Sequence, residues 1–299
     1  MKTAAIESEN ASYPRSRVLS DLAELVKARL TLLVLLTTAV GFYLGAPRPI
    51  DYRALFHVVF GTAAAAAGAA AMNQWWERSV DARMRRTRTR PVPAGRMRSR
   101  NALMLGTILS IFGVIYLAWF CHPLSAVLAA LTIVIYIFAY TPVKRISTGN
   151  TALGAVPGAI PPLIGWAAAR GTLGVGAWSL FAIVFLWQLP HFFAIAWMYR
   201  DDYVQAGFRM ISSNDRGGER SASQSVFFCI LLLVVAGLPA FVEVTTAIYL
   251  PIELALSGAF IAVAMRFLRT RTPTDARRLF LISIIYLPLL LGALVLTKV

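Results

Sequence analysis

Apolar stretches without a single charged side chain alternate with short charged segments along the whole chain. The longest of these stretches are 30–47, 54–76, 102–143, 146–169, 171–199, 221–242 and 279–297. A bilayer crossing needs about 20 predominantly apolar residues, and a helix satisfies its own backbone hydrogen bonds in lipid. The pattern therefore predicts an all-α, polytopic membrane protein.

The number of crossings depends on two segments. Stretch 102–143 is long enough for two spans, which Pro123 would separate because proline interrupts a helix. Region 244–265 is the weakest candidate, since Pro251 and Glu253 fall within it. Counting that region as one crossing predicts nine transmembrane helices, at about 28–46, 54–76, 102–121, 123–142, 152–169, 177–199, 222–243, 250–267 and 279–297.

The basic residues gather on one predicted side of the membrane. With nine spans, 25 of the 29 Lys and Arg residues fall on the side of the N-terminus. Only Arg48, Arg53, Arg170 and Lys298 fall on the other side. The positive-inside rule then places the N-terminus in the cytoplasm and the C-terminus outside. The net charge of +15 is therefore a topology signal, and it does not require a nucleic acid as partner.

The sequence predicts one membrane-embedded domain. Residues 1–27 are expected to form a cytoplasmic N-terminal tail and residues 28–299 the membrane domain. The tail is polar and acidic enough to differ from a signal or transit peptide, so we expect a multi-pass protein of the bacterial plasma membrane. Cys121 and Cys229 fall in different predicted spans, which favours neither a disulfide framework nor a zinc site.

Three polar residues continue the second predicted span. Asn73, Glu77 and Asp81 are spaced i, i+4, i+8, so a helix would align them in one stripe that Arg85 would extend. Oxygen-bearing side chains in such a row suit Mg²⁺, which prefers to share its coordination with a substrate phosphate. Guanidinium groups that bind phosphate oxygens follow at once, in Arg83, Arg85, Arg86, Arg88 and Arg90. The simpler alternative is a solvated helix end whose carboxylates pair with these arginines.

A second acidic segment follows the sixth predicted span, in "LPHFFAIAWMYRDDYVQAGFRM". It offers Asp201 and Asp202 together with Tyr203. An even number of spans separates it from the first segment, so both lie on the predicted cytoplasmic side. Two carboxylate clusters that face each other across a bundle would form a two-sided cage for a metal–diphosphate. Taken alone, the two aspartates would be read as part of a charged loop.

A third segment on the same predicted side is "YTPVKR", with Tyr140, Lys144 and Arg145. The two basic residues either contact an anionic ligand or only mark the cytoplasmic side. The span that follows contains several prolines and glycines, which lipid-exposed helices avoid unless the freed backbone groups face protein or a cavity.

Taken together, these segments resemble the UbiA-type intramembrane prenyltransferases, and within that superfamily the branch that farnesylates haem. The resemblance rests on "NQWWERSVDARMRRTRTRPVPAG", "YTPVKR", "NTALGAVPGAIPPLIGWAA" and "LPHFFAIAWMYRDDYVQAGFRM", which lie between Asn73 and Met210. The nine predicted helices extend the likeness to nearly the whole chain. It implies a nine-helix UbiA-type bundle.

The resemblance also implies a reaction. Farnesyl diphosphate would ionise with the help of Mg²⁺, and a vinyl group of protohaem IX would capture the farnesyl carbon. Addition of water would then give haem O, which a downstream haem A synthase would use. Protohaem IX would be a substrate here rather than a prosthetic group, and the lipid bilayer would surround the site.

Residue by residue, the resemblance implies the following roles. Asn73, Glu77 and Asp81 match the first metal–diphosphate motif, and Asp202 with Asp201 matches the second. The metal ligands would be Asn73, Glu77, Asp81 and Asp202. The substrate would contact Arg85, Arg88, Tyr140, Lys144, Arg145, Tyr203 and His191. Two departures from the wider superfamily are Glu77, where many members have Asp, and Met198, near which they carry a further Asp.

His191 has two possible roles. It lies within the sixth predicted span, eleven residues before Asp202, which on one continuous helix is three turns and nearly the same face. A polar residue satisfied within the core is the simpler interpretation. The other is a contact with the porphyrin or an axial bond to its iron.

Two other functions remain open at this stage. One is a prenyltransferase with an aromatic acceptor such as 4-hydroxybenzoate. The other is a transporter of an anionic amphiphile, with which the Gly- and Pro-rich spans are compatible.

Overall fold

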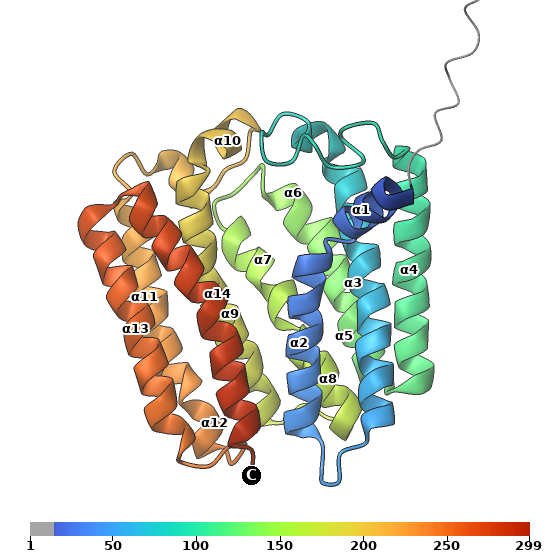
Figure 1. The fold of residues 1–299 in the computed structure, drawn as a ribbon, viewed down its shortest axis with the longest axis vertical. Helices are drawn as coiled ribbons and strands as arrows, with labels where there is room; N and C mark the ends of the chain where they lie inside the picture. Colours follow the sequence, from blue (N-terminus) through green and yellow to red (C-terminus); the bar gives the residue numbers. More distant parts are fainter. Residues whose placement is uncertain (1–14) are drawn as a thin grey trace, which may run out of the picture.

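The computed structural model describes residues 15–299, and the first part of the expected N-terminal tail, residues 1–14, lies outside the described residues. The described chain is a bundle of long helices, apart from a bridge between Thr245 and Lys298 (Figure 1). The helices are α1 (Arg15–Leu25), α2 (Ala28–Gly45), α3 (Tyr52–Asp81), α4 (Ser99–Phe120), α5 (Pro123–Val134), α6 (Thr141–Val143), α7 (Asn150–Ala159), α8 (Pro161–Arg170), α9 (Val175–Met198), α10 (Arg200–Gln205), α11 (Glu219–Ala236), α12 (Leu238–Phe241), α13 (Tyr249–Thr270) and α14 (Pro273–Leu296). A π-helical turn (Ile135–Tyr140) joins α5 to α6, and a short 3₁₀ turn (Ile211–Asn214) precedes α11.

Nine segments of the described chain are long and apolar enough to cross a bilayer, which confirms the predicted count. Proline interrupts several of them without ending the crossing: α5 continues through the π-helical turn into α6, and α7 continues into α8. The weakest predicted span is α13, and Glu253 enters it as a buried residue. Its carboxylate accepts a 2.7 Å hydrogen bond from the Ser257 hydroxyl, so this polar side chain is satisfied inside the bundle.

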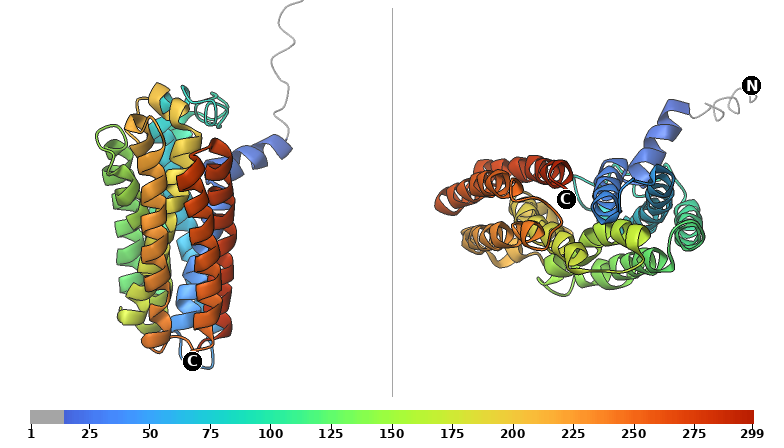
Figure 2. Two further views of the ribbon diagram at one scale, coloured as in Figure 1. Left: turned by 90° about the vertical axis from the view of Figure 1, so that its left-hand side faces the viewer. Right: turned by 90° about the horizontal axis from the view of Figure 1, so that it is seen from below.

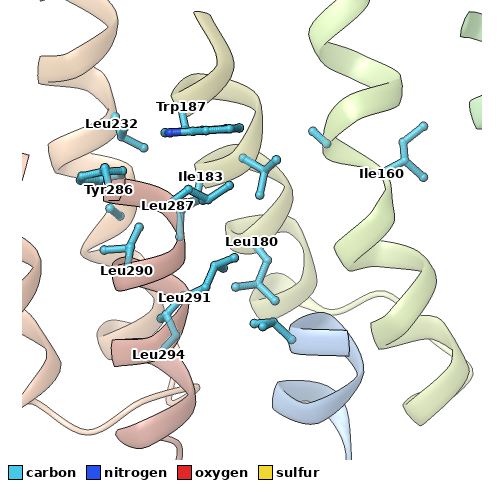
Figure 3. Packing of buried hydrophobic residues seen from close by; sticks show 14 of the residues in the cluster. Ile160, Leu180, Ile183, Trp187, Leu232, Tyr286, Leu287, Leu290, Leu291 and Leu294 are labelled. Atoms are coloured by element: carbon cyan, nitrogen blue, oxygen red, sulfur yellow. The ribbon is translucent and has the colours of Figure 1, made fainter. Parts of the chain in front are cut away.

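The chain runs around the bundle in sequence order, so that α14 returns to pack against α2 (Figure 2). The central helix is α9, which packs on both α11 and α14. Trp187 of α9 donates its indole N–H to the Ser283 carbonyl of α14, at 2.8 Å. Around it the leucine-rich faces of α9 and α14 interlock, with Leu180, Ile183, Leu287, Leu290, Leu291 and Leu294 (Figure 3).

Small residues bring α3 and α4 into close contact. A Cβ on Gly106 would lie 2.8 Å from the Met72 side chain, and one on Gly113 would lie 2.5 Å from the backbone nitrogen of Ala65. Because lipid provides no hydrophobic drive between helices, such close backbone approach is a usual source of packing energy in membranes. This packing fixes α3, whose last turns carry the first polar motif.

Both predicted motifs lie at one end of the bundle. The ends of α3 and α9, with α10, lie at the end where α1 is found, and the C-terminus lies at the opposite end (Figure 1). An odd number of crossings accounts for this separation. Which end faces the cytoplasm stays a prediction from the distribution of Lys and Arg.

Candidate active site

The last turns of α3 bury three polar side chains. Asn73, Glu77 and Asp81 are exposed by only 0%, 6% and 3%. The Asn73 amide donates to Glu77 Oε2 at 3.0 Å, so the first two members of the predicted stripe touch. Their burial excludes a solvated helix end, although one of the expected pairings with an arginine, that of Asp81 with Arg90, is present.

Lys144 joins this group from the other side of the bundle. Its ammonium lies 2.9 Å from Glu77 Oε1 and 3.2 Å from Oε2. The same ammonium lies 4.3 Å from the centre of the Tyr140 ring, a cation–π contact. Burial alone would lower the pKa of Lys144, but the Glu77 carboxylate and the Tyr140 and Tyr136 side chains raise that pKa above its usual value. Lys144 is therefore a permanent cation of the site.

The π-helical turn positions the tyrosines. Tyr136 and Tyr140 lie on it with their rings stacked at a centroid distance of 5.7 Å. Thr141 follows at once, donates to the Tyr136 carbonyl at 2.8 Å, and accepts from the Asn73 amide at 3.2 Å. Single π-helical turns are frequent at functional sites. This one brings Tyr136, Tyr140 and Thr141 together at Asn73.

Lys27 is a member of the site that the sequence did not indicate. Its ammonium donates to Asn73 Oδ1 at 2.6 Å and to the Tyr136 hydroxyl at 3.0 Å. In the sequence it stands directly before the first span, where it reads only as a marker of membrane sidedness. Tyr136 and Thr141 were missed too, because they lie among apolar residues of a predicted span.

The expected extension of the stripe to Arg85 is wrong, because α3 ends at Asp81. Arginines one helical turn apart would repel each other if the helix continued. Instead the chain turns back, and the Thr87 hydroxyl donates to the Asp81 carbonyl at 2.9 Å. Arg90 closes the turn with an ion pair of 2.7 Å to Asp81 Oδ2.

The arginine segment also meets the second acidic motif. Arg85 and Arg86 line one side of an open hollow of about 610 Å³, whose other lining residues include Asp201 and Asp202. Arg86 lies 3.5 Å from the Tyr203 hydroxyl. Residues within or just after each motif share one apolar cluster, with Val80, Met84, Ala206 and Phe208. The two motifs predicted to face each other are thus packed together.

The two aspartates of α10 differ in exposure. The Asp201 side chain is 84% exposed and lies 3.6 Å from Arg200, whereas Asp202 is half-buried. No ion pair or side-chain hydrogen bond joins Asp202 to another residue of the described chain. Of the other predicted contacts, Arg88 and Arg145 are exposed on the flanking loops.

No cluster of three or more His, Cys, Asp or Glu side chains within residues 15–299 is arranged to hold a metal ion. The oxygen donors of Asn73, Glu77, Asp81 and Asp202 nevertheless suit Mg²⁺, because a carboxylate has lone pairs beyond those that its cationic partner uses. Asp81, for example, binds Arg90 through Oδ2 alone. The donor chemistry therefore fits a hydrated divalent ion that bridges to a phosphate.

His191 lies deeper in the bundle, on α9. The helix that carries His191 does not continue to Asp202, because Tyr199 separates α9 from α10. The expectation that both residues lie on one helical face is therefore wrong. The His191 Nδ1 lies 2.7 Å from the Ser283 hydroxyl. That hydroxyl also lies 2.6 Å from the Phe280 carbonyl, which can only accept, and this arrangement favours the tautomer with the proton on Nδ1. The other ring nitrogen, Nε2, is then an acceptor and has no partner in the described chain.

The direction of His191 follows from its neighbours on α9. Trp187, one turn earlier, bonds to α14, while Gln188 donates to the Ala155 carbonyl of α7 at 3.3 Å. On a helical wheel His191 lies between these two positions. Its ring therefore faces the interior between α7 and α14, where α2 also packs.

Comparison with known proteins assigns the family. The UbiA prenyltransferase family matches residues 34–287, and the chain belongs to this family. A protoheme IX farnesyltransferase of Solibacter usitatus is 42% identical, over 93% of this chain and 98% of its own. One of Opitutus terrae is 45% identical, over 93% of this chain and 95% of its own.

Solved structures confirm the UbiA-type fold. A digeranylgeranylglyceryl phosphate synthase aligns with a TM-score of 0.78, at 16% identity, over 94% of this chain and 98% of its own. A UbiA homologue of Archaeoglobus fulgidus bound to GPP and Mg²⁺ aligns with a TM-score of 0.63, at 13% identity, over 92% and 99%. At such identities the likeness concerns the fold alone.

Proposed function

We propose that this protein transfers the farnesyl group of farnesyl diphosphate to a vinyl group of protohaem IX, forming haem O and releasing diphosphate. The observation that carries the proposal is the likeness to farnesyltransferases of that name over nearly the full length of both chains. The buried cationic and carboxylate groups at one end of the bundle support it independently, because they suit an anionic headgroup above an apolar interior.

The diphosphate would lie at this polar end, between the α3 motif and α10. Lys144 supplies a fixed positive charge there, and Arg85 and Arg86 add guanidinium groups from the hollow. Arg88 and Arg145 lie on the flanking loops and would approach from the solvent side. The apolar chain of the substrate then extends toward the interior, where water is scarce.

Mg²⁺ would be held by Asn73, Glu77, Asp81 and Asp202, and Asp201 would support the second motif from the surface. When bound, such an ion neutralises charge on the leaving diphosphate. The Archaeoglobus homologue with GPP and Mg²⁺ supports this expectation for the family fold. In this chain, Lys144 and Arg90 keep the carboxylates of Glu77 and Asp81 in place.

Ionisation of the substrate breaks the bond between the farnesyl carbon and the diphosphate oxygen. The negative charge on the diphosphate grows as this bond breaks, so the ammonium of Lys144 binds the transition state more strongly than the ground state. The faces of Tyr136 and Tyr140 are suited to the allylic cation that remains. One vinyl carbon of the porphyrin then bonds to that cation, which leaves the positive charge on the other vinyl carbon, and water adds to this second carbon with loss of a proton.

The porphyrin would lie deeper than the diphosphate, beside His191. The Ser283 hydroxyl fixes the imidazole so that Nε2 offers its lone pair to the interior. That nitrogen can bind the iron of the porphyrin, and the imidazole ring can otherwise contact the porphyrin itself. We also propose that the polar end faces the cytoplasm of a bacterial cell and that a haem A synthase uses the product.

A test of acceptor choice separates this function from its rivals. Purified protein in detergent is given farnesyl diphosphate, Mg²⁺ and either protohaem IX or 4-hydroxybenzoate, and released diphosphate is measured. Release that depends on protohaem IX supports the proposal. Release with 4-hydroxybenzoate alone would favour an aromatic acceptor, and no release with either would favour transport.

A further inference from the structure

The junction between α1 and α2 has an unusual backbone. Lys27 adopts the left-handed conformation, with φ 50° and ψ 52°, although it is not a glycine. This conformation is disfavoured for residues with a side chain and is often found where a residue is held for function. Here it turns the chain from α1, which projects sideways from the bundle near this end, into α2 (Figures 1 and 2).

Contacts from α3 and its following loop hold α1 in this position. Arg96 forms two hydrogen bonds to Asp21 Oδ1, of 2.8 and 3.1 Å, and a third of 3.2 Å to Oδ2. The Gln74 amide donates to the Glu24 carbonyl at 2.8 Å. Leu25 is fully buried against α3 and α4. The end of α1 is thus tied to the same turn of α3 that carries Asn73.

The charge of Lys27 is balanced differently from the other cations of the site. Lys144 pairs with Glu77, and Arg90 pairs with Asp81. Lys27 instead donates to two neutral oxygens, those of Asn73 and Tyr136, and the Glu77 carboxylate interacts with it only through space and not as a direct ion pair. A lysine ammonium has three donors, so one N–H remains for a further acceptor. A half-buried positive charge without a direct counterion favours an anionic ligand.

We propose that Lys27 donates its third N–H to the diphosphate of the prenyl substrate and that the junction between α1 and α2 is therefore part of the active site. Asp21 and Gln74 act as positioning residues, since they hold α1 rather than touch the ligand. The inference rests on the proposed function for the identity of the anion. Because the charge of the leaving diphosphate grows during ionisation, Lys27 contributes to turnover as well as to binding.

The first test uses the intact wild-type protein. The chain contains four lysines, at positions 2, 27, 144 and 298. Brief reductive methylation followed by peptide mass analysis measures how accessible each amine is. Inorganic diphosphate with Mg²⁺ should protect Lys27, whereas Lys298, at the opposite end of the bundle, should react equally with and without it. Equal labelling of Lys27 at saturating diphosphate would overturn the inference.

The second test compares Lys27→Met with Lys27→Arg and with Arg29→Met, an exposed neighbour in the chain. Calorimetry with inorganic diphosphate and Mg²⁺ should show affinity reduced about tenfold or more in Lys27→Met, as expected for loss of a charged hydrogen bond. The loss should be smaller in Lys27→Arg and absent in Arg29→Met. Asp21→Asn should shift affinity the same way, and KM for protohaem IX should stay unchanged in all four variants.

Different results would overturn the proposed function and the role of Lys27. If wild-type protein binds diphosphate through Lys27 but forms no haem O, the proposed function is wrong and the role of Lys27 in anion binding stands. If wild-type protein forms haem O while folded Lys27→Met keeps wild-type diphosphate affinity and wild-type kcat/KM for farnesyl diphosphate, the inference about Lys27 is overturned.

Discussion

The ammonium of Lys144 lies 2.9 Å from the carboxylate of Glu77, although 67 residues separate the two in sequence. The pair links the last turns of α3 to the end of α6, and both side chains are largely buried. The pair holds a negative charge beside a positive charge. A metal–diphosphate would need both, the carboxylate for the metal ion and the ammonium for the diphosphate. Several expected outcomes follow from this geometry.

Removal of one charge from the pair should cost stability. Lys144→Met leaves the Glu77 carboxylate buried without its main counterion, and loss of one partner of a buried pair costs about 3–5 kcal/mol. We expect a clearly lower thermal unfolding midpoint in detergent. The double variant Glu77→Gln, Lys144→Met should be more stable than Lys144→Met alone. A double variant no more stable than the single one would contradict direct coupling of the two side chains.

The stability that Lys144 provides should persist at moderately alkaline pH. The pKa of Lys144 is raised in the folded protein, so the stabilisation that it provides is fully present below its ordinary pKa and is lost progressively as the pH rises from that value through the raised one. Between about pH 7 and pH 9, the midpoint of unfolding should therefore show no loss caused by this group. A fall that is present in wild-type protein and absent in Glu77→Gln, Lys144→Met would show that the lysine deprotonates in this range.

Variants in which a motif carboxylate is replaced by a neutral amide should fold, but their kcat should be low. Glu77→Gln and Asp81→Asn remove charge from groups that act through electrostatics in the transition state, so kcat should fall about 10²-fold or more. Glu243→Gln and Arg53→Ala change exposed residues at the opposite end of the bundle and should leave kcat unchanged. Normal turnover by folded Glu77→Gln and Asp81→Asn would reduce both residues to structural roles.

A divalent cation should be required. The carboxylates of Glu77, Asp81 and Asp202 would repel a diphosphate that arrived without one. EDTA should abolish diphosphate release, and added Mg²⁺ should restore it. Full activity in buffer freed of metal ions would contradict the assignment of these residues as metal ligands.

Much of this arrangement can be predicted from the sequence, whereas the rest depends on contacts between segments that are distant in sequence. The charge-free runs predict the nine spans, because hydropathy is a local property. The spacing of Asn73 and Glu77 predicts their contact, because both lie on one helix. Lys27 reaches Asn73 across 46 residues of sequence, and nothing local distinguishes it from a topology marker. The end of α3 at Asp81 was missed for a similar reason, since the capping contact from Thr87 comes from the folded-back loop.

His191 should affect the acceptor and not the diphosphate. His191→Ala should weaken haem binding, measured from the Soret band on titration with protohaem IX, while calorimetric affinity for diphosphate with Mg²⁺ stays unchanged. Ser283→Ala should give a smaller effect in the same direction, because the imidazole loses the bond that fixes its tautomer. Weakened diphosphate binding with normal haem binding would contradict a role of His191 in binding the acceptor. No effect on either ligand would indicate that His191 is a structural residue.

The central claim is that this chain joins a farnesyl group to protohaem IX, and mass analysis of the pigment tests it most directly. Purified protein is incubated with protohaem IX, farnesyl diphosphate and Mg²⁺, with Glu77→Gln as the matched control, and the extracted pigment is analysed. We predict a pigment heavier than protohaem IX by one farnesyl group and one hydroxyl group in the wild-type reaction, and only a trace of it in the control. Unchanged protohaem IX in a wild-type reaction that has consumed farnesyl diphosphate would contradict the claim.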